Sequence, residues 1–274
     1  MRAGLLIALS LVLAACGSGG ERAGECPDGG CAVVVTSDVA YVDIETILTQ
    51  EPLLDVYAPE QDGPWPVVVI GPPRGQSKES AQDWATAITS EGAVVFAVDF
   101  EVGAPQTPQE HLNCAARYVR DVADDYGGDP SHVTLMGSSS GAVFGMPVAL
   151  GIDALPPMCL ATEEAASPDA FVGYEGYYGV GGDPGDLEVT DWIDPTALVG
   201  QNPQLVVRLL HGDYEETREQ DPVSQSEEFA ELLADAGYDV EFSLVQGGAH
   251  SGSYLPSSPA FDVIVNTTLD VAGG

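Results

Sequence analysis

A serine, a histidine and a group of carboxylates are spaced so that they could together cleave an acyl bond. The serine lies in residues 137–141, which read GSSSG, and only Ser139 has glycines two positions before and after it. An apolar run ends at Met136 and another apolar segment spans 142–150. A strand that turns directly into a helix needs flanking residues with almost no side chain. The pattern therefore predicts that Ser139 is a nucleophile on a tight strand-to-helix turn.

A serine hydroxyl needs a base to take its proton. His250 lies in a glycine-rich loop, 247–252, just beyond the last predicted strand, and thus at the sheet edge where Ser139 emerges. His211 ends a strand and more typically supports a turn, whereas His132 begins a strand at the opposite edge. His111 is expected on an exposed helix face. We therefore choose His250 as the base.

A carboxylate must orient that histidine, and the chain order nucleophile, acid, histidine favours the loop after residues 205–210. The residues alone do not choose among the carboxylates in this loop. They are Asp213, Glu215, Glu216, Glu219 and Asp221.

Apolar runs alternate with amphipathic segments along the chain, which predicts a mostly parallel sheet with helices on both faces. No internal repeat or second domain is evident, so 31–274 is expected to form one α/β domain. The predicted strands are 32–35, 53–57, 66–70, 92–100, 132–136, 171–174, 205–210 and 240–245. The predicted helices are 80–91, 108–126, 142–150, 222–237 and 259–271.

From residue 33 to 271 the chain resembles the α/β-hydrolase superfamily, in particular its bacterial carboxylesterase and dienelactone-hydrolase-like members. Residues 126–130, YGGDP, are similar to the family's approach to its nucleophile turn, and 53–59, LLDVYAP, to its entry strand. His211 and Gly212 match the family's HGxxD segment.

The resemblance implies a catalytic triad of Ser139, His250 and Glu215, because the acid of HGxxD falls on Glu215. Asp221 and Asp213 are the alternatives. Glutamate in place of the family's aspartate is a departure, since the longer side chain must fold back to reach the imidazole.

The oxyanion-binding loop is a second departure. The family usually has HGG or HGGG after the strand at 67–70, whereas this chain has Gly71, Pro72, Pro73, Arg74 and Gly75. Proline has no amide hydrogen to donate. The amides of Arg74, Gly75 and Gln76 remain, and we choose Arg74, with Ser140 as the donor at the turn.

These features predict a serine hydrolase that cleaves small-molecule carboxylic esters through an acyl-enzyme, without a cofactor or metal. An exopeptidase or thioesterase of the same fold is an alternative, and a non-catalytic binding protein that kept the fold is another. Tyr174, Tyr177 and Tyr178 either line the substrate pocket or pack in the core.

The chain is strongly acidic, with a formal charge of −35 and a single lysine, Lys78. Such a field repels phosphate backbones and anionic lipid headgroups, so nucleic-acid binding and polybasic membrane docking are excluded. The acidic groups are spread along the chain and are interpreted as a solvated surface.

The N-terminus has the pattern of a processing signal. One arginine precedes an apolar stretch that ends at residue 15 and is shorter than the about 20 residues of a membrane span. Residues 13–16, LAAC, resemble a lipobox, which predicts lipidation of Cys16 after removal of signal peptide 1–15. An ordinary secretory signal, with Cys16 a spare thiol, is the alternative. Residues 16–30 are expected to be a flexible tether between the anchor and the domain. With the lipobox, this predicts an exported bacterial lipoprotein that is held at the cell membrane only by its lipid. The protein is expected to be a monomer.

Four further cysteines remain in the exported chain, and an even number argues for two disulfides. Of the three possible pairings we favour Cys26 with Cys31 and Cys114 with Cys159. Free buried thiols are the alternative for the second pair.

Overall fold

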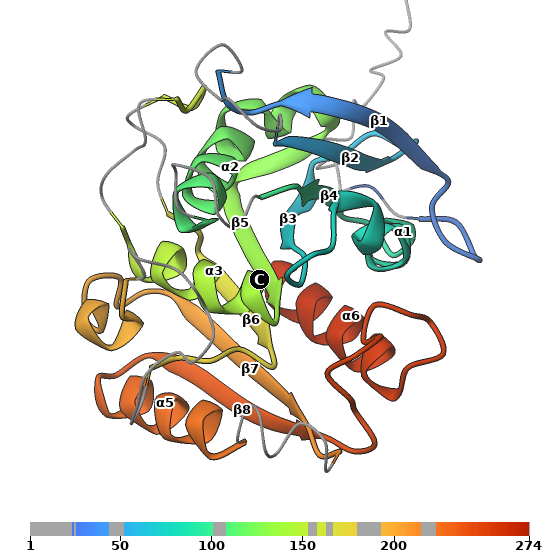
Figure 1. The fold of residues 1–274 in the computed structure, drawn as a ribbon. Helices are drawn as coiled ribbons and strands as arrows, with labels where there is room; N and C mark the ends of the chain where they lie inside the picture. The colour runs from blue at the N-terminus through green and yellow to red at the C-terminus, as the bar shows by residue number, and fades with distance from the viewer. Residues whose placement is uncertain are drawn as a thin grey trace, which may run out of the picture.

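The computed structural model describes residue 24 and residues 26–43, 52–100, 108–152, 158–162, 167–179, 193–214 and 223–273. Its centre is a sheet of eight strands in the order β1-β2-β4-β3-β5-β6-β7-β8 (Figure 1). The strands are β1 (Val33–Ala40), β2 (Leu53–Pro59), β3 (Trp65–Gly71), β4 (Val94–Val98), β5 (Gly128–Ser138), β6 (Ala170–Tyr174), β7 (Val206–Gly212) and β8 (Asp239–Val245).

The sheet is mostly parallel, as the sequence predicts. β1 pairs antiparallel with β2, and β2 antiparallel with β4. From β4 to β8 every neighbouring pair is parallel. The carboxyl ends of β3 to β8 therefore lie along one edge of the sheet, which is where open α/β sheets place their binding sites.

Helices cover both faces of the sheet (Figure 1). They are α1 (Gln82–Ser90), α2 (Pro108–Val122), α3 (Ser140–Leu150), α5 (Val223–Asp235) and α6 (Pro259–Ala272), with short 3-10 turns at η2 (Lys78–Ala81), η3 (Ala123–Tyr126) and η4 (Pro195–Leu198).

The two faces carry separate hydrophobic cores because successive strand side chains point to opposite sides. In β3, Val67 and Val69 join the core beneath α2, α3 and α5, whereas Val68 and Ile70 join the core beneath α1 and α6. A strand buried on both sides needs an unbroken apolar run, and that is why these runs are readable in the sequence.

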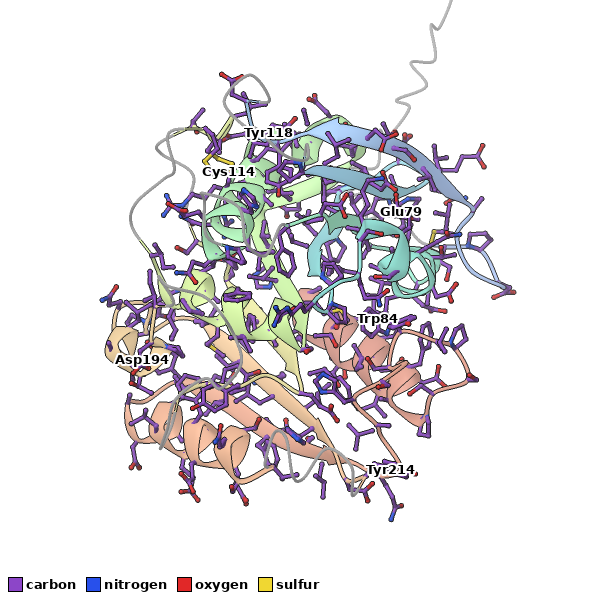
Figure 2. All side chains as sticks on the ribbon, in the orientation of Figure 1. Glu79, Trp84, Cys114, Tyr118, Asp194 and Tyr214 are labelled. Atoms are coloured by element: carbon purple, nitrogen blue, oxygen red, sulfur yellow. A yellow bond between two sulfur atoms is a disulfide. The ribbon has the colours of Figure 1, made fainter. Side chains whose placement is uncertain are left out.

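The two predicted disulfides are present. Cys26 and Cys31 close a short loop, and Cys114 on α2 is joined to Cys159 (Figure 2). The strand bridge between Val42 and Cys159 brings the segment around residue 159 next to the residues that follow β1.

One prediction is wrong. His111 lies on α2 as expected, but its side chain is completely buried instead of exposed. The cause is that α2 packs on the sheet and also against α3, so the helix is covered over more of its circumference than the apolar stripe alone suggested.

The signal peptide 1–15, Cys16 and most of the tether lie outside the described residues. Among the residues that are described, no helix is both long and apolar enough to cross a membrane.

Candidate active site

Ser139 occupies the turn between β5 and α3. It is the residue before the first helical residue, and its backbone has φ 52° and ψ −119°, in a region that residues with a side chain rarely adopt. Such strain persists only where the surroundings enforce it, and it is concentrated at functional sites. Its side chain is half-buried at the carboxyl edge of the sheet.

The two glycines of the pentapeptide are required by close backbone packing. A Cβ on Gly137 would overlap the carbonyl oxygen of Gly141, and a Cβ on Gly141 would overlap the carbonyl oxygen of Gly71. The turn at Ser139 is therefore wedged against the end of β3. This is the tight geometry that the spacing of glycines predicts.

His250 pairs with a carboxylate that the sequence analysis did not select. Its Nδ1 lies 2.6 Å from Oε2 of Glu175, whose side chain is completely buried, while 42% of the His250 side chain is exposed. Glu175 directly follows β6. Its other oxygen, Oε1, accepts a hydrogen bond of 3.0 Å from the backbone N–H of Gly212 at the end of β7.

The backbone of Glu175 is fixed as firmly as its side chain. Its φ is 50°, and its N–H donates to the carbonyl oxygen of Leu210 at 2.9 Å. A buried carboxylate needs partners for its lone pairs. Glu175 finds them in a backbone amide and the imidazole, which leaves Nε2 of His250 as the ring nitrogen that does not face the acid.

Tyr174 connects the serine turn, residues 137–141, with the histidine loop, residues 247–252. Its carbonyl oxygen accepts a hydrogen bond of 2.9 Å from the N–H of Ser139, and its hydroxyl donates to the carbonyl oxygen of Ala249 at 3.1 Å. Burial, followed by the nearby Glu175 carboxylate, raises the pKa of the Tyr174 hydroxyl far above its ordinary value, so it stays a neutral donor. The dipeptide Tyr174–Glu175 therefore contacts both the backbone of Ser139 and the loop that carries His250.

Glu215 and Asp221 lie outside the described residues. Asp213 is described, and its Oδ1 accepts a hydrogen bond of 2.5 Å from the N–H of Gly247, the first residue of the histidine loop. Asp213 thus fixes the first residue of the histidine loop.

The other residues considered as bases or pocket walls have structural contacts. His211 is buried with Nδ1 3.2 Å from Oγ of Ser226, and His132 Nε2 lies 3.0 Å from the carbonyl oxygen of Val271. Tyr178 is buried and stacks on Phe229, with ring centroids 5.0 Å apart, so it packs in the core.

The N–H of Ser140 is one of the first amides of α3, which have no acceptor within the helix. The second proposed oxyanion donor, Arg74, lies on the loop that follows β3 and is exposed. Of the three amides considered there, that of Gln76 donates to the carbonyl oxygen of Pro73 at 3.1 Å.

Within the described part of the chain, no three His, Cys, Asp or Glu side chains are grouped so that they could hold a metal ion.

No protein-family model matches the chain, and no curated protein matches its sequence. Solved structures of esterases are similar to it. The apo form of Thermogutta terrifontis esterase 2 has a TM-score of 0.67 and 19% identity over 87% of this chain and 92% of that chain. A truncated carbohydrate esterase from gut microbiota has a TM-score of 0.61 and 18% identity over 92% of this chain and 100% of that chain. A structure of the Thermogutta esterase phosphonylated by cyclosarin, with a TM-score of 0.66, 18% identity and the same coverage as the apo form, is also similar. At these identities the likeness establishes a shared fold.

Proposed function

We propose that this protein is a serine hydrolase of carboxylic esters with an α/β-hydrolase fold, in which Ser139 is the nucleophile, His250 the general base and Glu175 the acid. The observation that carries the proposal is the 2.6 Å pair between His250 Nδ1 and the buried Glu175, at the sheet edge where Ser139 lies in a strained turn. The strand order and the similarity to esterases support the fold assignment.

The triad acid in this proposal differs from the one that the family resemblance suggests. Glu175 replaces Glu215 because it already contacts the imidazole and is held there by Gly212. Glu175 follows β6, whereas Glu215 follows β7. Because β6 and β7 are parallel neighbours, their last residues lie at the same edge of the sheet. β7 lies between β6 and β8, and the longer side chain of Glu175 spans this extra strand to reach His250.

The reaction would proceed in two halves. Nε2 of His250 takes the proton of the Ser139 hydroxyl as the serine oxygen bonds to the ester carbonyl carbon, and the carbonyl becomes an oxyanion. When the oxyanion collapses, the alcohol leaves with that proton and the acyl group stays on Ser139. Water then attacks with the same proton relay and releases the acid. Glu175 stabilises the imidazolium throughout.

The amides of Ser140 and Arg74 are the proposed donors to the oxyanion. Ser140 supplies the N-terminal amide of α3, where the helix dipole also favours negative charge. Arg74 follows two prolines that cannot donate, so it is the first amide of its loop able to take part.

Labelling of the full-length protein with a fluorophosphonate tests this proposal, because the probe reacts only with an activated serine. We expect the wild type to be labelled, and Ser139→Ala and His250→Ala to remain unlabelled. Ser131→Ala, in an exposed residue before the buried part of β5, is the control and should be labelled like the wild type. An unlabelled wild type would favour the non-catalytic binding protein, and a labelled Ser139→Ala would place the nucleophile elsewhere.

We further propose that residues 31–274 form a single domain and that the protein is an exported, monomeric lipoprotein attached through Cys16. The two disulfides support export because such bonds persist in oxidising compartments. Metabolic labelling with a fatty-acid analogue should mark the wild type and not Cys16→Ala, and light scattering should give the mass of one chain.

A further inference from the structure

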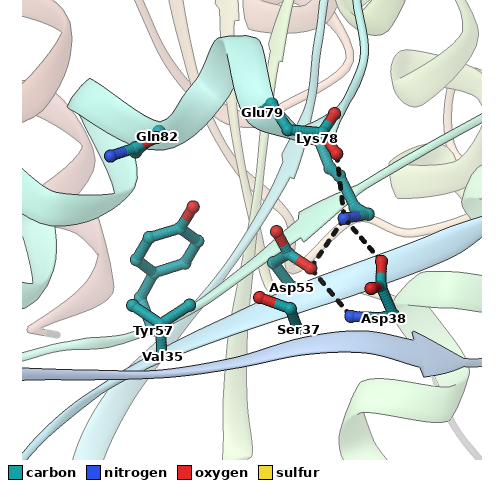
Figure 3. A pocket seen from close by; sticks show the side chains of 8 residues that line it. All are labelled: Val35, Ser37, Asp38, Asp55, Tyr57, Lys78, Glu79 and Gln82. Atoms are coloured by element: carbon teal, nitrogen blue, oxygen red, sulfur yellow. Dashed lines mark hydrogen bonds and ion pairs between the residues drawn. The ribbon is translucent and has the colours of Figure 1, made fainter.

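Lys78, the only lysine of the chain, is buried. Only 5% of its side chain is exposed, and its Nζ lies 2.8 Å from Asp55, 3.0 Å from Asp38 and 3.1 Å from Glu79. Figure 3 shows the ammonium group surrounded by these three carboxylates. A lysine is almost never buried unless it is paired, so this arrangement needs a reason.

Lys78 stands at the end of the loop that carries Arg74. This loop, residues 71–78, leaves β3 at Gly71, whose carbonyl group touches Gly141 in the first turn of α3. The four residues 74–77 in between are exposed. The first residue of the loop, Gly71, is therefore held by the serine turn, and its last residue, Lys78, is held by the contacts of its own main chain and side chain.

The anchor of Lys78 is the sheet itself. Its backbone N–H donates to Oδ1 of Asp99 at 2.6 Å, directly after β4, and its ammonium group reaches Asp55 within β2. Asp99 in turn donates its N–H to the carbonyl oxygen of Leu53 at 2.8 Å. Main chain and side chain of one residue thus fix the end of the loop to two adjacent strands.

We propose that Lys78 is a positioning residue for oxyanion stabilisation, holding the 71–78 loop so that the Arg74 amide stays aimed at the developing negative charge. The inference rests on the proposed function. An oxyanion donor acts only when it is placed in advance, and a shift of about 1 Å can lower the rate about 100-fold. Residues 74–77 of the loop are exposed, whereas Gly71, Pro72 and Lys78 are buried, so the buried ends of the loop set that placement.

A double variant separates this role from stability. Lys78→Met alone leaves the Asp55 carboxylate buried without its cation, which destabilises the fold. Lys78→Met combined with Asp55→Asn removes both charges, and the two other carboxylates remain hydrated because 68% of the Asp38 side chain and 63% of the Glu79 side chain are exposed. The hollow beside them, about 340 Å³ in volume, is open to solvent.

Arg120→Met is the matched control. Arg120 is also a largely buried cation, 11% exposed and 2.6 Å from Asp169, but it binds near the amino ends of β5 and β6, at the sheet edge opposite Ser139. Its loss should lower the unfolding temperature without changing turnover.

The experiment measures kcat and KM of the full-length variants on a p-nitrophenyl ester, per active site counted with the fluorophosphonate, together with inhibition by a trifluoromethyl ketone that forms an oxyanion on serine. For the double variant we expect kcat to fall about 10- to 100-fold, KM to change little, and ketone inhibition to weaken in proportion to kcat. Arg120→Met should retain wild-type values. A double variant with wild-type kcat, or an equal loss in Arg120→Met, would overturn the role of Lys78 while leaving the hydrolase intact. A wild type that neither hydrolyses nor is labelled would overturn both proposals.

Discussion

His250 and Glu175 are joined by a 2.6 Å contact although 75 positions separate them, and they come from the loops beyond β8 and β6. β7 lies between these strands, and its last residue, Gly212, donates to the free side of the same carboxylate. Three neighbouring strand ends therefore cooperate to orient one imidazole ring.

Glu175→Gln tests this relationship directly. An amide can keep the shape of the side chain, but it carries no charge to stabilise the imidazolium and can hold the wrong ring tautomer, so we expect kcat/KM to fall about 10³- to 10⁴-fold. Steady-state ester hydrolysis measures the loss, and circular dichroism checks that the fold is kept.

Glu215→Gln is the matched control, because it makes the same chemical change at the carboxylate that the family resemblance favours. We expect it to retain activity. Loss of activity in Glu215→Gln together with an active Glu175→Gln would return the role of triad acid to Glu215.

The sheet and its helices are predictable from the sequence because β3, β4 and β6 are buried on both faces and appear as apolar runs bounded by glycine, proline or polar residues. The serine turn is predictable for a related reason. Backbone atoms of α3 and β3 leave no room for a Cβ at Gly137 and Gly141. The sequence shows this requirement as two glycines that flank Ser139 at equal distances.

The contact between Glu175 and His250 is not predictable from the family resemblance, because its HGxxD segment points beyond β7, to Glu215. A signal was present: Glu175 is the charged residue at the end of the apolar run 170–174, where a carboxylate is costly unless it has a partner. Burial of Lys78 was also unpredictable, since its partners Asp38, Asp55 and Asp99 come from three separate segments.

Gly141→Ala should disrupt the serine turn, residues 137–141. Its new methyl group would overlap the carbonyl oxygen of Gly71 and lie 2.9 Å from that of Pro72, and neither backbone segment can move without displacing β3 or the loop after it. We expect a loss of about 3 kcal/mol in the free energy of unfolding, and a loss of activity. Urea denaturation measures the first.

Gly273→Ala is the control for an added methyl group, because its nearest atom would be the Leu269 carbonyl oxygen at 3.4 Å and its φ is −78°. It should change the free energy of unfolding by less than about 0.5 kcal/mol. Equal urea midpoints for the wild type and Gly141→Ala would contradict the close packing described for the turn.

The two disulfides should contribute unequally to stability. Cys114 and Cys159 are 45 positions apart, whereas Cys26 and Cys31 are 5 apart, and the entropy removed from the unfolded chain grows with the closed loop. The expected losses on replacing each pair by alanine are about 4 and about 2 kcal/mol. Guanidinium unfolding of the two double variants measures the difference. A larger loss for the Cys26 pair would show that loop entropy does not set the order.

Glu79 provides a test by pH. Hydrogen bonds from the Ser77 side chain and its own backbone N–H, together with Lys78, lower the pKa of its carboxyl from 4.5 to about 2 in the folded protein. A carboxyl whose pKa is depressed by folding adds stability that is complete above its unfolded pKa and is lost as the pH falls through the folded pKa.

Glu79→Gln lacks this contribution. The wild type should therefore unfold with a higher free energy than Glu79→Gln at neutral pH, by a modest amount because the carboxylate is largely exposed. The difference should shrink between pH 4.5 and 2, as followed by urea unfolding at each pH. A difference that grows as the pH falls would mean that the carboxyl is held in its protonated form.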